Sequence, residues 1–136
     1  MITAIDTNVL LDVLGAEPPF AMASFQAIEA ARRIGSLIAC EVVWSETAAW
    51  FESAEQATLN LAGMGINYDP LDAPGAAQAG IAWRRYRSAG GPRSRLLADF
   101  LVGAHASTRA DRLLTRDRGF YRRYFQDLII IDPSRA

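Results

Sequence analysis

Four acidic residues, Asp6, Glu46, Asp99 and Asp117, are the residues of this sequence best suited to do chemistry together. Carboxylates brought close to one another repel, and each tends to keep its proton unless a cation neutralises the group. Mg²⁺ or Mn²⁺ resolves this conflict, because both ions take hard oxygen ligands, retain bound water and stabilise charge that builds up on a phosphodiester. We therefore interpret the four acids as a divalent-metal site suited to hydrolysis.

Glu46 lies in a segment whose apolar residues recur at helical spacing. Val42 and Val43 precede it by four and three residues, and Ala49 and Trp50 follow it by three and four. This pattern predicts that Glu46 is on the core-facing side of its helix. An ionised carboxylate is costly there unless it meets a cation or strong hydrogen-bond donors, and a plain surface position is the structural alternative.

The other three acids have structural alternatives that the sequence leaves open. Asp99 is the only acid between residues 96 and 106, in the first turn of a helix expected to be almost buried, where the helix N-terminus alone would stabilise it. Asp6 and Asp117 each follow a short apolar segment, so both are predicted at the carboxyl ends of strands, where ligands bind in such folds. A helix N-cap for Asp6 and a turn for Asp117 are the alternatives.

Charge is distributed unevenly along a chain whose net charge is only -1. Residues 1–83 contain two arginines and ten acids, whereas residues 84–123 contain eleven arginines and three acids, and lysine is absent. Guanidinium groups suit phosphate oxygens, so the basic segment favours a polyanionic partner, with a solvated surface as the alternative. Arg116 and Arg118 flank Asp117 and are candidates to hold an RNA backbone.

Length and composition predict one compact domain over residues 1–136, which is 51% hydrophobic. The first residues mix acids with apolar side chains, and no apolar run is long enough for a membrane span, so we expect a cytoplasmic protein without a membrane partner. Cys40 is expected to be a small buried residue, not a nucleophile. With one Cys and one His, zinc ligation is not expected, and His105 is interpreted as a helix residue.

Apolar periodicity predicts strands that alternate with helices, which is typical of a three-layer α/β/α fold with a central parallel sheet of about four to five strands. The expected strands are residues 2–5, 37–40, 66–68, 113–114 and 128–131. The expected helices are residues 9–15, 18–35, 42–51, 54–64, 72–87, 96–109 and 118–124, with a break at 89–94.

Four segments resemble the PIN-domain ribonucleases, and among them the VapC toxins of toxin–antitoxin pairs. They are residues 5–11 (IDTNVLL), 44–46 (WSE), 99–106 (DFLVGAHA) and 113–121 (LLTRDRGFY). Their order and spacing cover nearly the whole chain, and all four acidic positions are filled. Residues 52–95 carry no recognisable signature of the family and are expected to help in choosing the substrate.

The resemblance implies a PIN-like fold and an endoribonuclease that depends on Mg²⁺ or Mn²⁺ and uses water to attack phosphorus. It implies that Asp6 and Asp99 are the main metal ligands, that Asp117 is an additional ligand, and that Glu46 binds a metal-bound water or acts as a base. Asn8 and Thr115 are similar to residues that orient the acids by hydrogen bonding, with turn and capping roles as alternatives.

The resemblance also implies partners. These are an RNA substrate, a second copy of the chain in a homodimer, and a VapB-like antitoxin that joins a larger complex, blocks the site and binds operator DNA.

Two other functions fit parts of the sequence. Phosphatases of the haloacid-dehalogenase type also place an Asp after the first strand, but they need a second Asp two positions later and a lysine. Here the second position is Asn8, and the chain has no lysine. A catalytically silent PIN-like module that only binds RNA or regulates is the non-enzyme alternative. Loss of catalysis should erode at least one acid, and none is missing.

Overall fold

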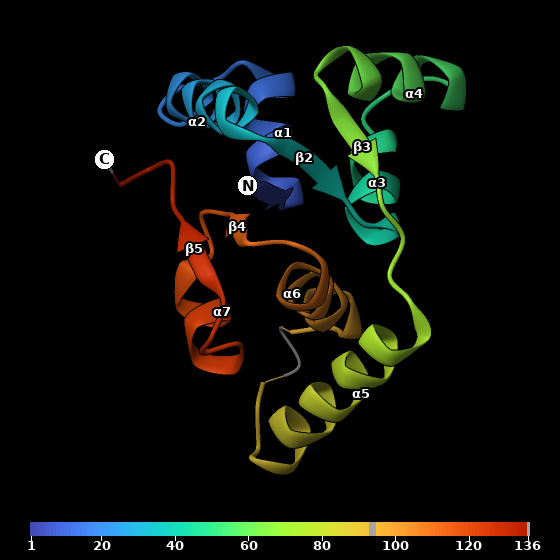
Figure 1. Cartoon of the computed structure of the whole chain (residues 1–136), viewed down its shortest axis with the longest axis vertical. Helices are drawn as coiled ribbons and strands as arrows, with labels where there is room; N and C mark the ends of the chain where they lie inside the picture. The colour runs from blue at the N-terminus through green and yellow to red at the C-terminus, as the bar shows by residue number, and fades with distance from the viewer. Residues whose placement is uncertain (93–94, 136) are drawn as a thin grey trace.

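The computed structural model describes residues 1–92 and 95–135, and its centre is a parallel β-sheet (Figure 1). The strands are β1 (Ile2–Ile5), β2 (Ser36–Ala39), β3 (Ile66–Tyr68), β4 (Arg112–Leu114) and β5 (Ile129–Ile131). The strands lie in the order β3-β2-β1-β4-β5, and every neighbouring pair is parallel. The predicted parallel sheet is therefore confirmed.

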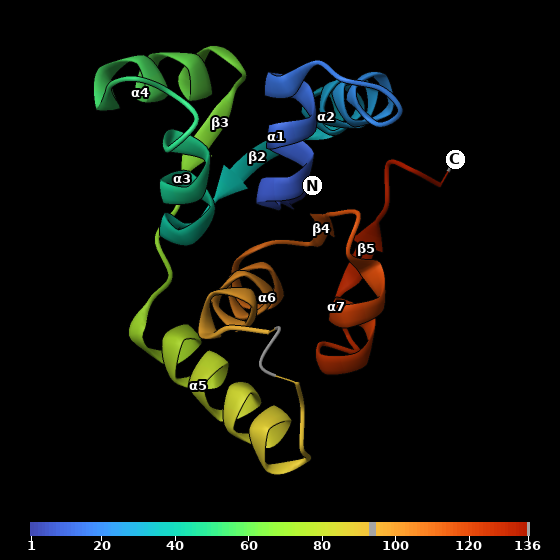
Figure 2. The same cartoon turned by 180° about the vertical axis from the view of Figure 1, so that it is seen from behind.

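Seven helices connect and cover the strands in the described part of the chain. They are α1 (Thr7–Gly15), α2 (Ala21–Ile34), α3 (Glu41–Ala48), α4 (Ala54–Gly63), α5 (Ala73–Ser88), α6 (Leu97–Arg109) and α7 (Arg118–Tyr124). Helices α2 and α4 lie at one end of the molecule, and α5 packs along α6 at the other, as both views show (Figures 1 and 2). The α/β/α class expected from the sequence is confirmed.

The winding of the sheet reverses next to its central strand. From β1 the chain moves outward to β2 and β3, and it then returns to the other side of β1 to form β4 and β5. Residues 3–5 of β1 are buried because the strand is paired on both edges and covered on both faces. Ligands in open parallel sheets bind outside the carboxyl ends of the strands at such a reversal. Asp6 and residues 115–117 follow these ends of β1 and β4.

An aromatic cluster joins the helices α5, α6 and α7. Phe100 in α6 is fully buried, and its ring centroid lies 5.4 Å from that of Tyr86 in α5 and 5.2 Å from that of Phe120 in α7. Phe125, which follows α7, packs so closely on α6 that a Cβ at Gly103 would come within 2.3 Å of its ring. The packing of this cluster fixes the positions of α6 and α7, which contain Asp99 and Tyr121.

The differences from the predicted boundaries are small. Strand β2 ends one residue before Cys40, because Cys40 has extended backbone angles and begins the turn into α3 as its N-cap. Its thiol is buried as expected, and burial raises its pKa. The predicted break after α5 is present from Ala89 to Pro92, whereas residues 93 and 94 lie outside the described residues.

His105 is a buried residue of helix α6, as the sequence predicts. Its Nε2 lies 2.9 Å from Oδ2 of Asp69, directly after β3, and Asp69 also pairs with Arg109. Arg109 and His105 together hold the pKa of Asp69 below its usual range. No helix in the described residues has both the length and the apolarity needed to cross a bilayer.

Candidate active site

Asp6 is a buried carboxylate at the carboxyl end of the central strand. One oxygen, Oδ1, accepts a hydrogen bond of 2.8 Å from the backbone N–H of Thr7 and so caps helix α1. The other, Oδ2, accepts from the hydroxyl of Thr115 at 2.8 Å, the hydroxyl of Tyr121 at 3.1 Å and the amide of Asn8 at 3.3 Å. The N-cap alternative is thus present together with a network of side chains.

Asn8 and Thr115 tie this carboxylate to the loop that follows β4. The Asn8 amide donates to Oγ1 of Thr115 at 3.2 Å, and its oxygen accepts from the backbone N–H of Arg116 at 3.1 Å. Oγ1 of Thr115 also accepts from the backbone N–H of Asp117 at 3.0 Å. These bonds fix the direction of the Asp6 side chain, so the two residues have the geometry of supports that orient an acid.

Glu46 is exposed, so the prediction that it lies on the core-facing side of its helix is wrong. Helix α3 ends at Ala48, and its buried face is formed by Val43 and Thr47. The apolar residues that follow Ala48 lie beyond the helix and do not extend that face. Glu46 nevertheless lies at the site, because its Oε1 accepts a 2.7 Å hydrogen bond from the hydroxyl of Thr7, the first residue of α1.

Asp99 is partly buried in the first turn of α6. Its Oδ2 accepts a hydrogen bond of 3.0 Å from the backbone N–H of Leu96, which precedes the helix. The favourable end of the helix dipole therefore stabilises this carboxylate, as the structural alternative predicted. The neighbouring residue, Phe100, points into the aromatic cluster, so the packing of that cluster fixes where Asp99 stands.

Asp117 is the N-cap residue of α7, but its side chain makes no capping hydrogen bond. Both of its oxygens face the guanidinium group of Arg95, with Nη2 3.1 Å from Oδ1 and Nη1 in contact with Oδ2. The Arg95 guanidinium carbon also lies 4.4 Å from the centre of the Phe120 ring. A cation of the protein itself thus neutralises Asp117 in this structure.

Three of the acids act electrostatically on one buried hydroxyl. Burial and the charges of Asp6, Asp99 and Asp117 all raise the pKa of Tyr121 well above its ordinary range. Burial is also the main cause that raises the pKa of Asp6, and its hydrogen bonds from Thr115, Thr7 and Tyr121 only partly offset that cost. The ionised form of Asp6 is therefore disfavoured, and a nearby cation would stabilise it.

The donor set fits a hard divalent ion in chemistry but is not gathered around one point. Over residues 1–92 and 95–135, no three His, Cys, Asp or Glu side chains form a ready metal-binding group. The reason is visible in the contacts, because Asp99 faces the N–H of Leu96 and Asp117 faces Arg95. All of these oxygens belong to carboxylates, which Mg²⁺ and Mn²⁺ prefer, and the buried Asp6 accepts hydrogen bonds from neutral groups only, in the described part of the chain. The residues fit such an ion once Asp99 and Asp117 turn from their present partners.

The two arginines that flank Asp117 point to other acids. Nε of Arg116 lies 2.7 Å from Oδ2 of Asp12, and its guanidinium carbon lies 4.1 Å from the centre of the Phe20 ring. Nε of Arg118 lies 3.8 Å from Oδ2 of Asp132. The structure therefore does not direct either guanidinium group at the four acids.

Sequence reasoning missed Arg95 and Tyr121. Tyr121 follows Asp117 by four residues, so a helix that starts at Asp117 returns Tyr121 to the same side, and this spacing was available as a signal. Arg95 precedes Asp99 by four residues, but it lies before α6 in a stretch without any recognisable motif. No sequence signal pairs Arg95 with an acid that is 22 residues away.

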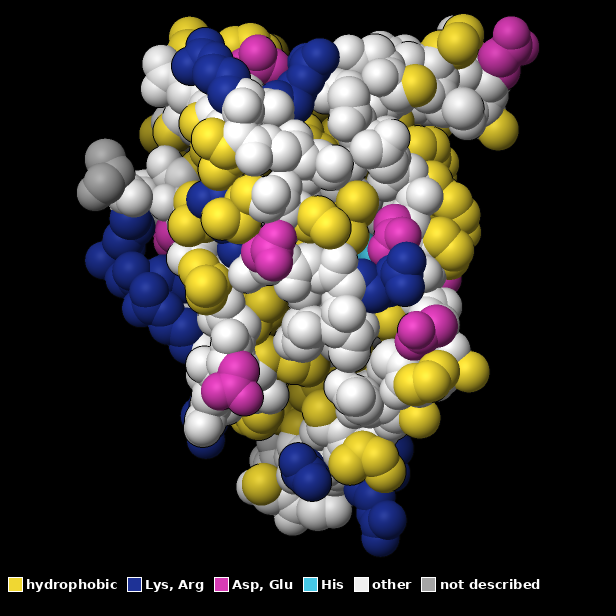
Figure 3. Space-filling view, viewed as in Figure 1, with side chains coloured by type: hydrophobic (Ala, Val, Ile, Leu, Met, Phe, Trp, Pro, Cys, Tyr) yellow, Lys and Arg dark blue, Asp and Glu magenta, His cyan; other side chains and the backbone are white. Residues whose placement is uncertain are grey.

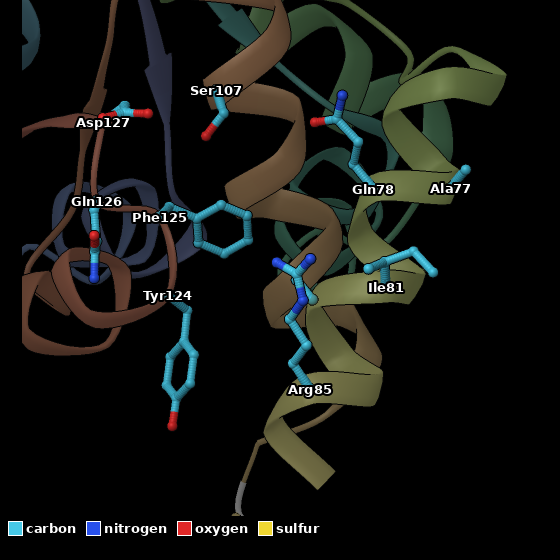
Figure 4. Close-up of a pocket in the computed structure, with 10 residues that line it drawn as sticks. Ala77, Gln78, Ile81, Arg85, Ser107, Tyr124, Phe125, Gln126 and Asp127 are labelled. Atoms are coloured by element: carbon cyan, nitrogen blue, oxygen red, sulfur yellow. The ribbon is translucent and has the colours of Figure 1, made fainter. Parts of the chain in front are cut away.

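One hollow of the surface is separate from these acids. It lies between α5, α6 and the end of α7, and it has a volume of ≈ 610 Å³. Figure 4 shows Gln78 and Arg85 reaching into it from α5, with Ser107 on α6 and Asp127 on the far side. None of the four acids lines it, so its position is no guide to the chemistry of Asp6.

The fold and the site together define a parallel α/β domain with acids at the reversal point of its sheet. The sequence profile of the PIN domain family matches residues 3–126, so the chain belongs to the PIN domain family. Comparison with curated proteins gives no match.

Solved structures with the same fold include bacterial toxin–antitoxin assemblies. A chain of VapBC2 from Rickettsia felis, crystallised with a DNA fragment from its promoter, has a TM-score of 0.74 at 18% identity, over 97% of this chain and 98% of that one. A chain of VapBC-1 from nontypeable Haemophilus influenzae has a TM-score of 0.71 at 20% identity, over 99% and 100%. A chain of a toxin–antitoxin complex from Klebsiella pneumoniae has a TM-score of 0.68 at 19% identity, over 96% and 97%.

Proposed function

We propose that this PIN-domain chain is an endoribonuclease that depends on Mg²⁺ or Mn²⁺ and hydrolyses RNA phosphodiester bonds in the cytoplasm. The observation that carries the proposal is the carboxylate of Asp6. It is buried at the reversal point of the sheet and held by the hydroxyls of Thr115 and Tyr121. Capping of α1 alone does not call for a carboxylate that is also tied to Thr115 and Tyr121, and the burial of its charge is costly unless a cation offsets it.

The residues divide the work as follows. Asp6 and Asp99 would hold the ion, with Asp117 as a further ligand, and the ion would neutralise the phosphate and lower the pKa of a bound water. Asn8 and Thr115 keep Asp6 in one direction by hydrogen bonding. Glu46, which is exposed and accepts a hydrogen bond from Thr7, would bind a metal-bound water or take a proton from the attacking water.

Metal removal tests this proposal directly. Purified protein incubated with total RNA should cleave it in the presence of Mg²⁺ or Mn²⁺, and an excess of EDTA should stop cleavage. Gel electrophoresis of the products, with end-group analysis for the expected 5′-phosphate and 3′-hydroxyl, provides the measurement. Cleavage that continues in EDTA would contradict the metal site, and RNA binding without cleavage would favour the catalytically silent alternative.

We also propose that the chain is the toxin of a toxin–antitoxin pair and acts as a homodimer. Support comes from the shared fold with chains of VapBC assemblies and of the Klebsiella pneumoniae complex. The proposed partner is a VapB-like antitoxin that blocks the acids and joins a larger complex on DNA. Arg116 and Arg118 stay candidates for the RNA backbone, provided that their pairs with Asp12 and Asp132 open.

Growth of a bacterial host tests the toxin role. Expression of the chain alone should arrest growth, and co-expression of a small gene adjacent to its own should relieve the arrest. Expression at a good level without any effect on growth would count against the role of toxin but would leave the nuclease proposal in place.

A further inference from the structure

A groove lies beside the acids, between the end of α5 and the start of α6. It is lined by Trp83, Tyr86, Arg87, Gly91, Pro92, Arg95 and Leu96. Its volume of ≈ 460 Å³ falls within the roughly 300–1,000 Å³ of ligand pockets in proteins. The groove is therefore large enough to hold part of a polymer.

The floor of this groove is well fixed. The hydroxyl of Tyr86 donates to the carbonyl of Pro92, and the backbone N–H of Gly91 donates to the carbonyl of Tyr86 at 2.9 Å. The Tyr86 ring lies so close to Gly91 that a Cβ there would come within 2.5 Å of it. Since Tyr86 is also part of the buried aromatic cluster, the groove is built on the core of the protein.

The groove combines positive charge with an aromatic face. Both charged residues that line it, Arg87 and Arg95, are arginines, and no acid lines it in the described part of the chain. The guanidinium carbon of Arg87 lies 4.6 Å from the centre of the Trp83 ring, so this cation covers one face of the ring. Figure 3 shows arginine side chains at the surface near the end of the molecule where α5 terminates.

Arg95 connects the groove to the acids. It lines the groove on one side and pairs with Asp117 on the other. A chain lying in the groove therefore meets Arg95, which also contacts one of the carboxylates. The groove combines cations with an aromatic ring, as proteins that bind single-stranded nucleic acid do.

We propose that this groove holds the RNA strand next to the bond that is cleaved, with one base stacked on Trp83 and the adjoining phosphates on Arg87 and Arg95. The inference rests on the proposed function, since it names where the substrate of that site lies. Single-stranded RNA is the occupant because it supplies phosphates for Arg87, and for Arg95 once its pair with Asp117 opens, together with a flat base for the partly buried Trp83 ring that lines the groove. An acidic peptide supplies only the first.

Arg87 offers a test that does not endanger the fold, because its side chain is exposed. Arg84 is its matched control, since it is also exposed on α5 but does not line the groove. Both substitutions, Arg87→Gln and Arg84→Gln, are made in an Asp99→Asn protein so that RNA stays intact. Fluorescence anisotropy with a labelled single-stranded RNA of about twelve nucleotides, within the range of site sizes of such proteins, gives the affinity.

Arg87→Gln should weaken binding by about 5- to 10-fold and lower the slope of log affinity against log salt by about 0.7, the value for one phosphate contact on a single strand. Arg84→Gln should leave both within error of the parent protein. Trp83→Leu should weaken binding roughly 10-fold and Trp83→Phe much less, because stacking needs an aromatic face. Thermal unfolding of each variant separates a loss of binding from a loss of folding.

Three results would overturn the groove. One is equal binding by the Arg87→Gln and Arg84→Gln proteins, and another is equal weakening by the two Trp83 variants. The third is a polyglutamate peptide that binds as tightly as RNA and loses that binding in Arg87→Gln, which would assign the groove to acidic polymers. None of these results would contradict the proposed nuclease activity. That proposal would be contradicted by a different result, namely the absence of metal-dependent cleavage by the unaltered protein.

Discussion

Asp99→Asn should reduce metal-dependent RNA cleavage by about 10²- to 10³-fold, the size of effect seen when a main electrostatic group of an active site is removed. The substitution removes a charge that the metal needs but keeps an oxygen that accepts from the N–H of Leu96. The start of α6 should therefore be preserved, and the thermal unfolding midpoint should change little. Initial rates on a defined RNA, measured with saturating Mn²⁺, give the comparison.

A matched control for this result is Asp127→Asn. Asp127 is an exposed acid beyond α7 that does not touch the four acids, and it lines only the separate hollow of Figure 4. Its substitution removes one negative charge from the protein as Asp99→Asn does, and cleavage should stay within about twofold of the parent, as for surface changes in general. If Asp99→Asn keeps more than a tenth of the activity, Asp99 is not a main ligand.

Phe100→Ala should lower the free energy of unfolding by about 3–5 kcal/mol, the usual loss when a buried Phe is truncated in a core. Phe100 is fully buried and packs against the rings of Tyr86, Phe120 and Tyr124. A domain of this size holds only about 5–15 kcal/mol in total, so much of the variant should unfold under mild conditions. Urea titration followed by circular dichroism measures the change.

The milder Phe100→Leu variant keeps the transition measurable and should lose roughly half as much. Phe25→Ala is the control, because that ring lies 49% exposed on α2 and its removal opens no cavity. It should cost less than about 1 kcal/mol. A Phe100→Ala protein that is as stable as Phe25→Ala would show that the aromatic cluster does not hold α5, α6 and α7 together.

The fold was open to prediction because its signals are local and repeated. Strands β1, β2 and β5 are short and largely apolar, and α1, α4 and α5 each begin after a residue whose side chain caps the helix. Thus Asp72 caps α5 through the N–H of Gly75, and α1 ends at Gly15, as the residue types indicate. The placement of acids at strand ends follows from the same reasoning, since parallel strands direct their carboxyl ends to one edge.

The environment of each acid was harder to predict because it depends on contacts between distant segments. Glu46 was misplaced because apolar residues up to Trp50 were counted as one helical face, although α3 ends before them and Trp50 is 54% exposed. The pairing of Asp117 with Arg95 was missed because periodicity describes one element at a time. It says nothing of which arginine, among eleven in the basic segment, meets which acid.

The order in which the chain is synthesised determines when the hydrogen bonds around Asp6 can form. The side chain of Thr115, which holds Asp6, is synthesised 109 residues later, and that of Tyr121 later still. The central strand that carries Asp6 also lacks its β4 neighbour until then. A ribosome adds about 5–20 residues per second, so a growing chain carries Asp6 for several seconds without the two hydroxyls of Thr115 and Tyr121 that help to orient it. If the chain is an RNA-cleaving enzyme, it cannot attack the message or ribosome that is making it until residues 112–121 have emerged and folded.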